Sequence, residues 1–304
     1  AGTGERGRND ALACCEALAA LTAVKPQAVV PFSTGVIGEP LPVGKITDAL
    51  QQALDDLAED GWNRAATGIM TTDTLPKGVS KKIVIDGKTI TITGIVKGAG
   101  MIKPNMATML SYIATDAAVD GIRLQKIFSH AVEHSFNRIT VDGDTSTNDS
   151  AILIATGKSG VTINDSNTSE FEDAVTAVCI TLAQMLVRDG EGATKFVSVV
   201  VTGGAAESEC LKAAYAIAES PLVKTALFAS DPNWGRLLAA IGRAGIDNLD
   251  VDRVELHIND VLIAQNGCRA ASYTEAQGAA AMASEEIEIC VNLNRGDADA
   301  AVWT

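Results

Sequence analysis

The chain has 304 residues, of which 47% are apolar, which is enough for one large core or two domains and excludes a disordered protein. Its net charge of −14 argues against nucleic acids and anionic membranes as partners, since both attract basic surfaces. The sequence shows no apolar run of transmembrane length and no signal peptide, and its six cysteines form no Cys-x-x-Cys pair. We therefore expect a cytoplasmic globular protein with reduced thiols.

Amphipathic periodicity and capping residues predict the helices of the chain. An Ala- and Leu-rich helix begins at a capping Asn9 or Asp10 and extends to Thr22. Thr47 caps a second predicted helix, which reaches Asp60. The longest apolar stripe predicts a helix over residues 168–188. Further helices are expected at residues 122–135, 207–219 and 234–244.

Short apolar runs predict strands, and turn residues between some of them predict hairpins. Asp86-Gly87 separates two runs, 82–85 and 88–96, and is typical of a type I′ turn. Because strands and helices do not alternate regularly, the order favours an α+β fold over a doubly wound sheet. A second hairpin is expected at 251–264, and single strands at 28–32, 65–71, 109–115, 151–155, 196–202 and 286–293.

The stretch from Lys97 to Leu110 has the features of a constrained functional loop. Two glycines near its start permit positive φ or close approach to a ligand, and Pro104 fixes the backbone further on. This loop delivers Thr108 to the start of a buried strand. A threonine hydroxyl there can act as a nucleophile, and cutting the Ala107–Thr108 bond would also give it a free α-amine as its base. From spacing alone, an ordinary strand threonine is the alternative.

Several other motifs resemble functional sites but lack a required residue. His130 and His134 have the i, i+4 spacing of zinc ligands, without the further ligands of a zinc site. A calcium loop that starts at Asp142 needs glycine and glutamate where Thr147 and Leu153 stand. A phosphate-binding loop that ends at Ser159 needs glycine where Ile152 stands. We therefore expect no metal site. We expect residues 142–149 to be a polar loop whose side chains bond backbone amides near an active site.

Two glycine-containing motifs have both a functional and an ordinary interpretation. Ser33-Thr34-Gly35 follows a predicted strand and can supply an oxyanion hole from the Gly35 amide and a neighbouring hydroxyl, or form a plain turn. Glu191 lies between two glycines after a predicted helix, where the glycines can simply end that helix.

Six separated stretches together resemble the glutamate N-acetyltransferase (ornithine acetyltransferase) family of arginine biosynthesis. They follow one another in the family's order over nearly the whole chain, so the set is more specific than any single motif. The stretches are residues 31–38, 71–74, 97–110, 142–149, 190–195 and 230–236.

The resemblance implies roles for the matching residues. Thr108 matches the nucleophile that self-cleavage frees after Ala107. Thr34 and Gly35 match the oxyanion hole. A lysine suits a substrate carboxylate and a glutamate suits a substrate ammonium. The implied substrate contacts are Thr71, Lys97, Thr108 and Glu191.

The implied reaction is ping-pong acetyl transfer from N-acetylornithine to glutamate through an acetyl-threonine, without a metal or organic cofactor. Acetyl-CoA is a second donor in bifunctional members of the family. The implied fold is a layered α-β-β-α sandwich with a smaller C-terminal α/β part. We expect a catalytic core at residues 1–190 and a C-terminal domain at 195–304. Cleavage would give chains 1–107 and 108–304, which associate as a heterotetramer.

The family pattern also extends past both ends of this sequence. It has a further N-terminal segment before Ala1 and a substrate-binding tail beyond Thr304, so we expect the chain to be truncated at both ends. Two other functions stay open at this point. One is a self-cleaving aminopeptidase or amidase, in which water resolves the acyl-enzyme, and the other is a non-catalytic binding protein with an intact chain.

Overall fold

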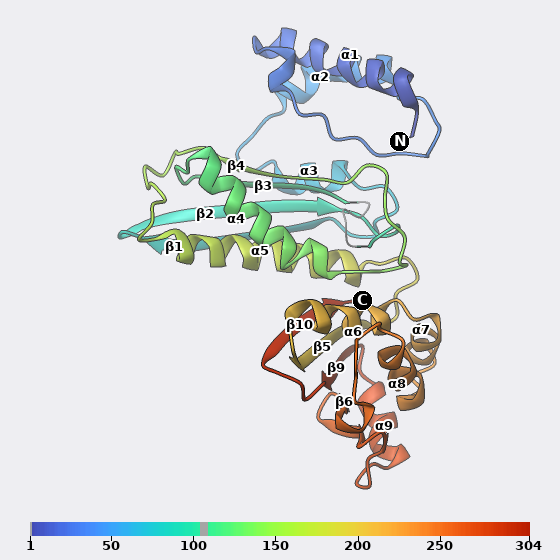
Figure 1. Cartoon of the computed structure of the whole chain (residues 1–304). Coiled ribbons are helices and arrows are strands. Elements are labelled where there is room, and N and C mark those ends of the chain that lie inside the picture. Colours follow the sequence, from blue (N-terminus) through green and yellow to red (C-terminus); the bar gives the residue numbers. More distant parts are fainter. Residues whose placement is uncertain (1, 104–108) are drawn as a thin grey trace.

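The protein has a mixed α+β architecture with two β-sheets (Figure 1). The computed structural model describes residues 2–103 and 109–304. A four-stranded sheet has the order β1-β2-β3-β4, and a six-stranded sheet has the order β10-β5-β9-β6-β7-β8. No helix within these ranges is long and apolar enough to cross a membrane.

The four-stranded sheet begins with the predicted hairpin. Asp86 and Gly87 connect its strands with φ values of 51° and 74°, which is the left-handed pair that a type I′ turn requires. β2 then pairs antiparallel with β3, and β3 pairs parallel with β4. The four strands are β1 (Lys77–Ile85), β2 (Lys88–Lys97), β3 (Leu110–Thr115) and β4 (Ser150–Ala155).

Two predicted helices cover this sheet. α5 (Thr168–Arg188) packs on β1 and β2, and α4 (Gly121–Glu133) packs on α5 and β4. The helix lies close to the sheet at Gly94, where an added Cβ would be 2.8 Å from the Cδ1 of the fully buried Leu182. The apolar stripe of α5 therefore faces the sheet, as its periodicity predicted.

The segment before β1 is helical or irregular, and the two strands expected in it are not formed. α1 (Gly4–Thr22) and α2 (Val43–Asp55) pack on each other and stand apart from the four-stranded sheet in Figure 1. The strand predicted at 28–32 is wrong, because this segment pairs with no strand and begins in a short 3₁₀ turn. The strand predicted at 65–71 is also wrong. Most of it belongs to helix α3 (Trp62–Gly68), which packs on β1 and β2 and buries Ala66.

The second sheet and its helices contain the rest of the chain. Predicted strands and helices at 196–202, 207–219, 234–244 and 286–293 are confirmed within two residues at each end. The helices α7 and α9 and the strands β8 and β10 were not predicted. The elements are β5 (Phe196–Gly204), α6 (Glu207–Ala218), α7 (Pro221–Phe228), α8 (Trp234–Gly242), β6 (Glu255–Ile258), β7 (Val261–Gln265), β8 (Cys268–Arg269), α9 (Glu275–Met282), β9 (Glu286–Asn292) and β10 (Ala298–Trp303).

The two sheets have separate apolar cores that meet along the segment after α4. One core surrounds α5 and the other surrounds β5 and β9. At the junction, the Thr140 amide donates to the Trp303 carbonyl at 3.0 Å, and the Tyr215 hydroxyl donates to the Asn137 carbonyl at 2.6 Å. The C-terminus therefore lies beside the junction between the two sheets, as Figure 1 shows.

Candidate active site

Lys97 brings three of the predicted site residues together. Its side chain is only 2% exposed, and its Nζ donates to the Thr71 Oγ1 at 3.2 Å and contacts the Thr34 Oγ1 at 3.5 Å. Burial lowers the pKa of Lys97, and the nearby Lys77 lowers it further, while Asp73 and Asp149 act in the opposite direction. A buried ammonium thus faces two hydroxyl groups from distant segments of the chain.

Glu191 contacts the residues that follow Lys97 at the end of β2. The Glu191 amide donates to the Ala99 carbonyl at 2.8 Å. Its carboxylate rests against Gly100, where an added Cβ would lie only 2.8 Å from the Oε1. Glu191 is exposed and lines a cavity of about 320 Å³ together with Lys224 and Phe228. The turn that follows α5 therefore places the Glu191 carboxylate against the residues directly after Lys97.

The predicted oxyanion hole lies on this site, and the predicted nucleophile lies outside the described residues. The Thr34 hydroxyl contacts Lys97, and Gly35 follows Thr34 directly in an irregular segment. Ala107 and Thr108 belong to the range that is not described. Their roles as cleavage site and nucleophile stay predictions from the resemblance.

The loop at 142–149 binds the chain on both sides of that range. Asp142 accepts the amides of Met101 at 2.6 Å and Ile102 at 3.1 Å. Asp149 accepts the amide of Met109 at 3.0 Å. This confirms the expectation that acidic side chains of the loop bond backbone amides. Two carboxylates therefore hold the flanks of the segment that carries the predicted nucleophile.

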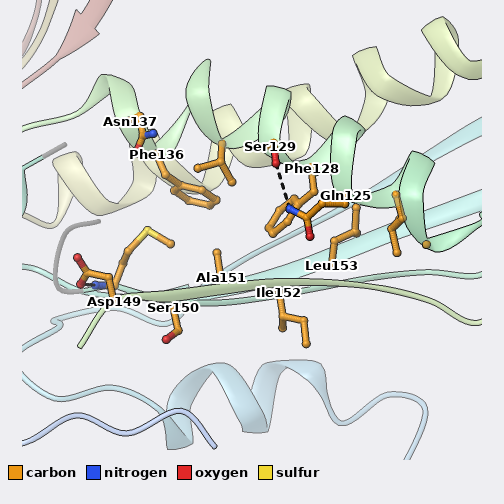
Figure 2. A pocket seen from close by; sticks show the side chains of 14 residues that line it. Gln125, Phe128, Ser129, Phe136, Asn137, Asp149, Ser150, Ala151, Ile152 and Leu153 are labelled. Atoms are coloured by element: carbon orange, nitrogen blue, oxygen red, sulfur yellow. Dashed lines mark hydrogen bonds between the residues drawn. The ribbon is translucent and has the colours of Figure 1, made fainter. Parts of the chain in front are cut away.

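Asp149 also lies at one end of an open groove between α4 and β4 (Figure 2). The groove has a volume of about 350 Å³, and Phe128, Phe136 and Leu153 give it an apolar lining. Burial raises the pKa of Asp149 to about 6, although the Met109 amide, the Ser146 hydroxyl and the charge of Lys97 favour its ionised form. Its Oδ2 is buried and has no hydrogen-bond partner among the described residues.

Nothing in the sequence indicated a buried charge cluster next to the site, formed by Lys77 and two aspartates. The Nζ of Lys77 lies 2.6 Å from the Asp73 Oδ1 and 2.5 Å from the Asp189 Oδ2. Isolated charged residues in loops normally suggest a solvated surface. Asp73 belonged only to the 71–74 motif, and Lys77 lay outside the strand predicted at 82–85, which in the structure begins at Lys77.

The two histidines lie at the C-terminal end of α4, His130 in its last turn and His134 at its C-cap. The His130 and His134 rings lie 4.1 Å apart, each Nε2 facing a glutamate, at 3.6 Å from Glu172 and 3.9 Å from Glu207. Within residues 2–103 and 109–304, no group of three or more metal-binding side chains is arranged around one point.

Comparisons with known proteins identify the family. The ArgJ family profile matches residues 1–304. The "Arginine biosynthesis bifunctional protein ArgJ" of Pseudomonas syringae pv. tomato is 60% identical over 308 residues, which cover all of this chain and 76% of that protein. The protein of the same name from Pseudomonas fluorescens is 59% identical with the same coverage.

A solved structure agrees with these matches. The crystal structure of Arginine biosynthesis bifunctional protein ArgJ from Bacillus halodurans, at 2.00 Å resolution, is similar with a TM-score of 0.59 at 35% sequence identity. The similarity covers 62% of this chain and 89% of that chain. Because the family profile matches residues 1–304 and both relatives are 59–60% identical over the whole of this chain, the chain belongs to the ArgJ family of bifunctional arginine biosynthesis proteins.

Proposed function

We propose that this protein transfers the acetyl group of N-acetylornithine to glutamate through an acetyl-threonine, and that acetyl-CoA also donates acetyl to glutamate. The observation that carries the proposal is the environment of Lys97. Among the described residues its buried ammonium contacts only hydroxyl oxygens, those of Thr71 and Thr34. Burying a charge without an ionic partner is costly. A substrate carboxylate would supply that partner.

The two charged groups of the site fit the two ends of an amino-acid substrate. Lys97 would bind the α-carboxylate of N-acetylornithine, and later that of glutamate. Glu191 would bind the side-chain ammonium of N-acetylornithine, because its exposed carboxylate lines a cavity. With both ends held, the acetyl amide lies between them, which reduces the entropic cost of reaching the transition state.

The chemistry would be carried by Thr108 and by the turn at Thr34. After cleavage of the Ala107–Thr108 bond, the α-amine of Thr108, with an ordinary pKa of about 7.7–8.0, accepts the hydroxyl proton near neutral pH. The Thr108 oxygen attacks the acetyl carbonyl, and the Thr34 hydroxyl and Gly35 amide stabilise the oxyanion. The proton passes to the departing amine of ornithine, and glutamate then attacks the acetyl-threonine.

Mass spectrometry of the purified protein tests this mechanism. We expect two chains, the second beginning Thr-Met-Leu-Ser. A short incubation with N-acetylornithine and no glutamate should add one acetyl group to that second chain, and glutamate should remove it as N-acetylglutamate. Release as free acetate regardless of glutamate would instead indicate an amidase. An intact chain in protein that transfers acetyl would refute the mechanism.

We also propose finer features that accompany this function. Residues 1–190 would form the catalytic core and residues 195–304 the C-terminal domain. Of the two β-layers of the expected α-β-β-α sandwich, the described residues of this core supply one, the four-stranded sheet. The separate apolar cores of the two sheets support this division. The cleaved chains, 1–107 and 108–304, would pair as a heterotetramer in the cytoplasm.

A further inference from the structure

Lys77 is a buried lysine at the start of β1 whose ammonium joins two buried carboxylates. Its side chain is 3% exposed, and the side chains of Asp73 and Asp189 are 0% and 8% exposed. Asp73 precedes β1, and Asp189 follows α5. Assembling three buried charges costs desolvation energy that their mutual attraction only partly offsets. We therefore ask which segments of the site these three charges hold in place.

Asp73 holds the two segments that form the Lys97 environment. One of its oxygens accepts the amide of Gly98, the residue after Lys97, at 2.6 Å. The other accepts the amide of Thr71, whose hydroxyl contacts Lys97, at 3.0 Å. The two carboxylate oxygens of Asp73 therefore fix the backbone of both segments that meet at the Lys97 ammonium.

Asp189 connects the same lysine to the Glu191 turn. It accepts the amide of Thr74 at 3.0 Å and also a hydrogen bond from the Thr74 hydroxyl. Glu191 follows Asp189 by two residues. Through its two acids, Lys77 therefore meets every described segment that carries a predicted substrate contact.

The charges of this cluster also act on Lys97. When ionised, Lys77, Lys97, Asp73 and Asp189 carry no net charge together. Burial opposes the ionisation of both acids, but hydrogen bonds from Lys77 and from backbone amides outweigh it and lower the pKa of each. Asp73 favours the charged form of Lys97, and Lys77 disfavours it. Asp73 thus acts on two cations and is bonded to only one of them.

We propose that Lys77 is a positioning residue for acetyl transfer: by binding Asp73, it leaves the Lys97 ammonium free to receive the substrate carboxylate. This inference rests on the proposed function. Without Lys77, Asp73 would lose its ion-pair partner among the described residues, and its charge already acts on the Lys97 ammonium. The two would pair, and the ammonium would be withdrawn from the hydroxyls of Thr71 and Thr34.

The variant Lys77→Met tests this role in the whole chain. The KM for N-acetylornithine should rise about tenfold, the scale of one charge-assisted hydrogen bond, while kcat changes less. At alkaline pH, kcat/KM should fall as Lys97 loses its proton. In Lys77→Met this alkaline limb should move to higher pH, because Lys97 no longer has the repelling charge of Lys77 nearby and pairs with the Asp73 carboxylate. A role in folding alone would not move this limb.

A second variant keeps the test decisive if Lys77→Met does not fold. Asp73→Asn removes the carboxylate that favours the charged form of Lys97, so its alkaline limb should move to lower pH, opposite to Lys77→Met. Arg138→Met is the matched control. Arg138 is equally buried and pairs with Glu207 at 2.6 Å, away from this cluster. The control should lower stability and leave the pH profile unchanged.

The outcomes separate this inference from the proposed function. If the wild-type protein does not transfer acetyl, the proposed function fails. If it does, and both variants keep the wild-type limb or move it in the same direction, the role of Lys77 is refuted and the proposed function stands.

Discussion

Gly100→Ala should impair substrate binding without destabilising the protein. The added methyl would lie 2.8 Å from the Glu191 Oε1 and 2.9 Å from its Cδ, whereas ordinary contact begins at 3.4 Å. The carboxylate must therefore move by about 0.6 Å. The Glu191 side chain is exposed, so it can move at little cost in stability. Gly100 has no positive φ, so alanine fits its backbone.

The size of the effect follows from this displacement. Misplacing a group by about 1 Å can cost on the order of a hundredfold in rate. A shift of 0.6 Å should therefore lower kcat/KM for N-acetylornithine roughly tenfold. The free energy of unfolding, measured by urea denaturation, should change by less than about 1 kcal/mol.

Two further variants make this test specific. Gly121→Ala is the control, because nothing lies within 4 Å of its added methyl, and its kinetics should match the wild type. In the Glu191→Gln background, Gly100→Ala should cause little further loss, since both changes act on one contact. Wild-type kinetics in Gly100→Ala, or full additivity of the two changes, would show that the substrate does not use the Glu191 carboxylate in this position.

Three other changes test the nucleophile, the acid beside it and the core. Thr108→Ala should abolish cleavage and transfer while Thr108→Ser keeps part of both, since only serine retains the hydroxyl; a denaturing gel and an acetyl-transfer assay check this, and transfer by the alanine variant would contradict it. Asp149→Asn should remove a pH dependence of stability. Because burial raises the pKa of Asp149 to about 6, its stabilising contribution is present below pH 4 and is lost as the pH rises through 6. After a discount for its partial exposure, wild type should lose on the order of 1 kcal/mol relative to Asp149→Asn between pH 4 and pH 7, and equal urea curves would refute it. Leu182→Ala should cost about 2–5 kcal/mol of unfolding free energy, because this side chain fills the space over Gly94, and a loss below 1 kcal/mol would mean that the site collapses freely.

The sequence predicted correctly the elements that are determined by their own residues, such as a tight turn or an apolar helix face. The Asp86-Gly87 turn sets its own hairpin, and the apolar stripe of α5 needs only one buried face. The stretch at 65–71 failed because a short apolar run fits a strand or a helix equally well. Contact with β1 and β2 decided in favour of the helix α3. The strand expected at 28–32 failed because nothing in sequence tells whether a strand will find a partner.

Capping residues could have revealed the helices that were missed. Ser220 caps α7 and is followed by Pro221 at the first helical position. Thr274 and Gln277 form a complete capping box at α9. Both helices are only 8 residues long, so their apolar periodicity is weak and the caps are the stronger evidence.

For the site as well, contacts within a loop could be predicted from sequence, whereas contacts between distant segments could not. The acids of the 142–149 loop could be assigned to backbone amides because Asp and Asn side chains commonly bond the main chain in turns. Thr34, Thr71 and Lys97 were linked only through family resemblance, because their meeting depends on the fold. The Lys77 cluster could not be predicted, since Asp189 is 112 residues from Lys77 in sequence and only the fold brings the two together.

The strand order has a consequence for a protein cut between Ala107 and Thr108. β1 and β2 would then belong to the first chain and β3 and β4 to the second, with six residue pairs joining β2 to β3. α5, from the second chain, also covers the two strands of the first. Neither piece could bury its half of this core alone, so the cut protein would be a complex of complementing fragments. After denaturation its renaturation would become a second-order process, slower on dilution, while the uncut chain would refold at a rate independent of concentration.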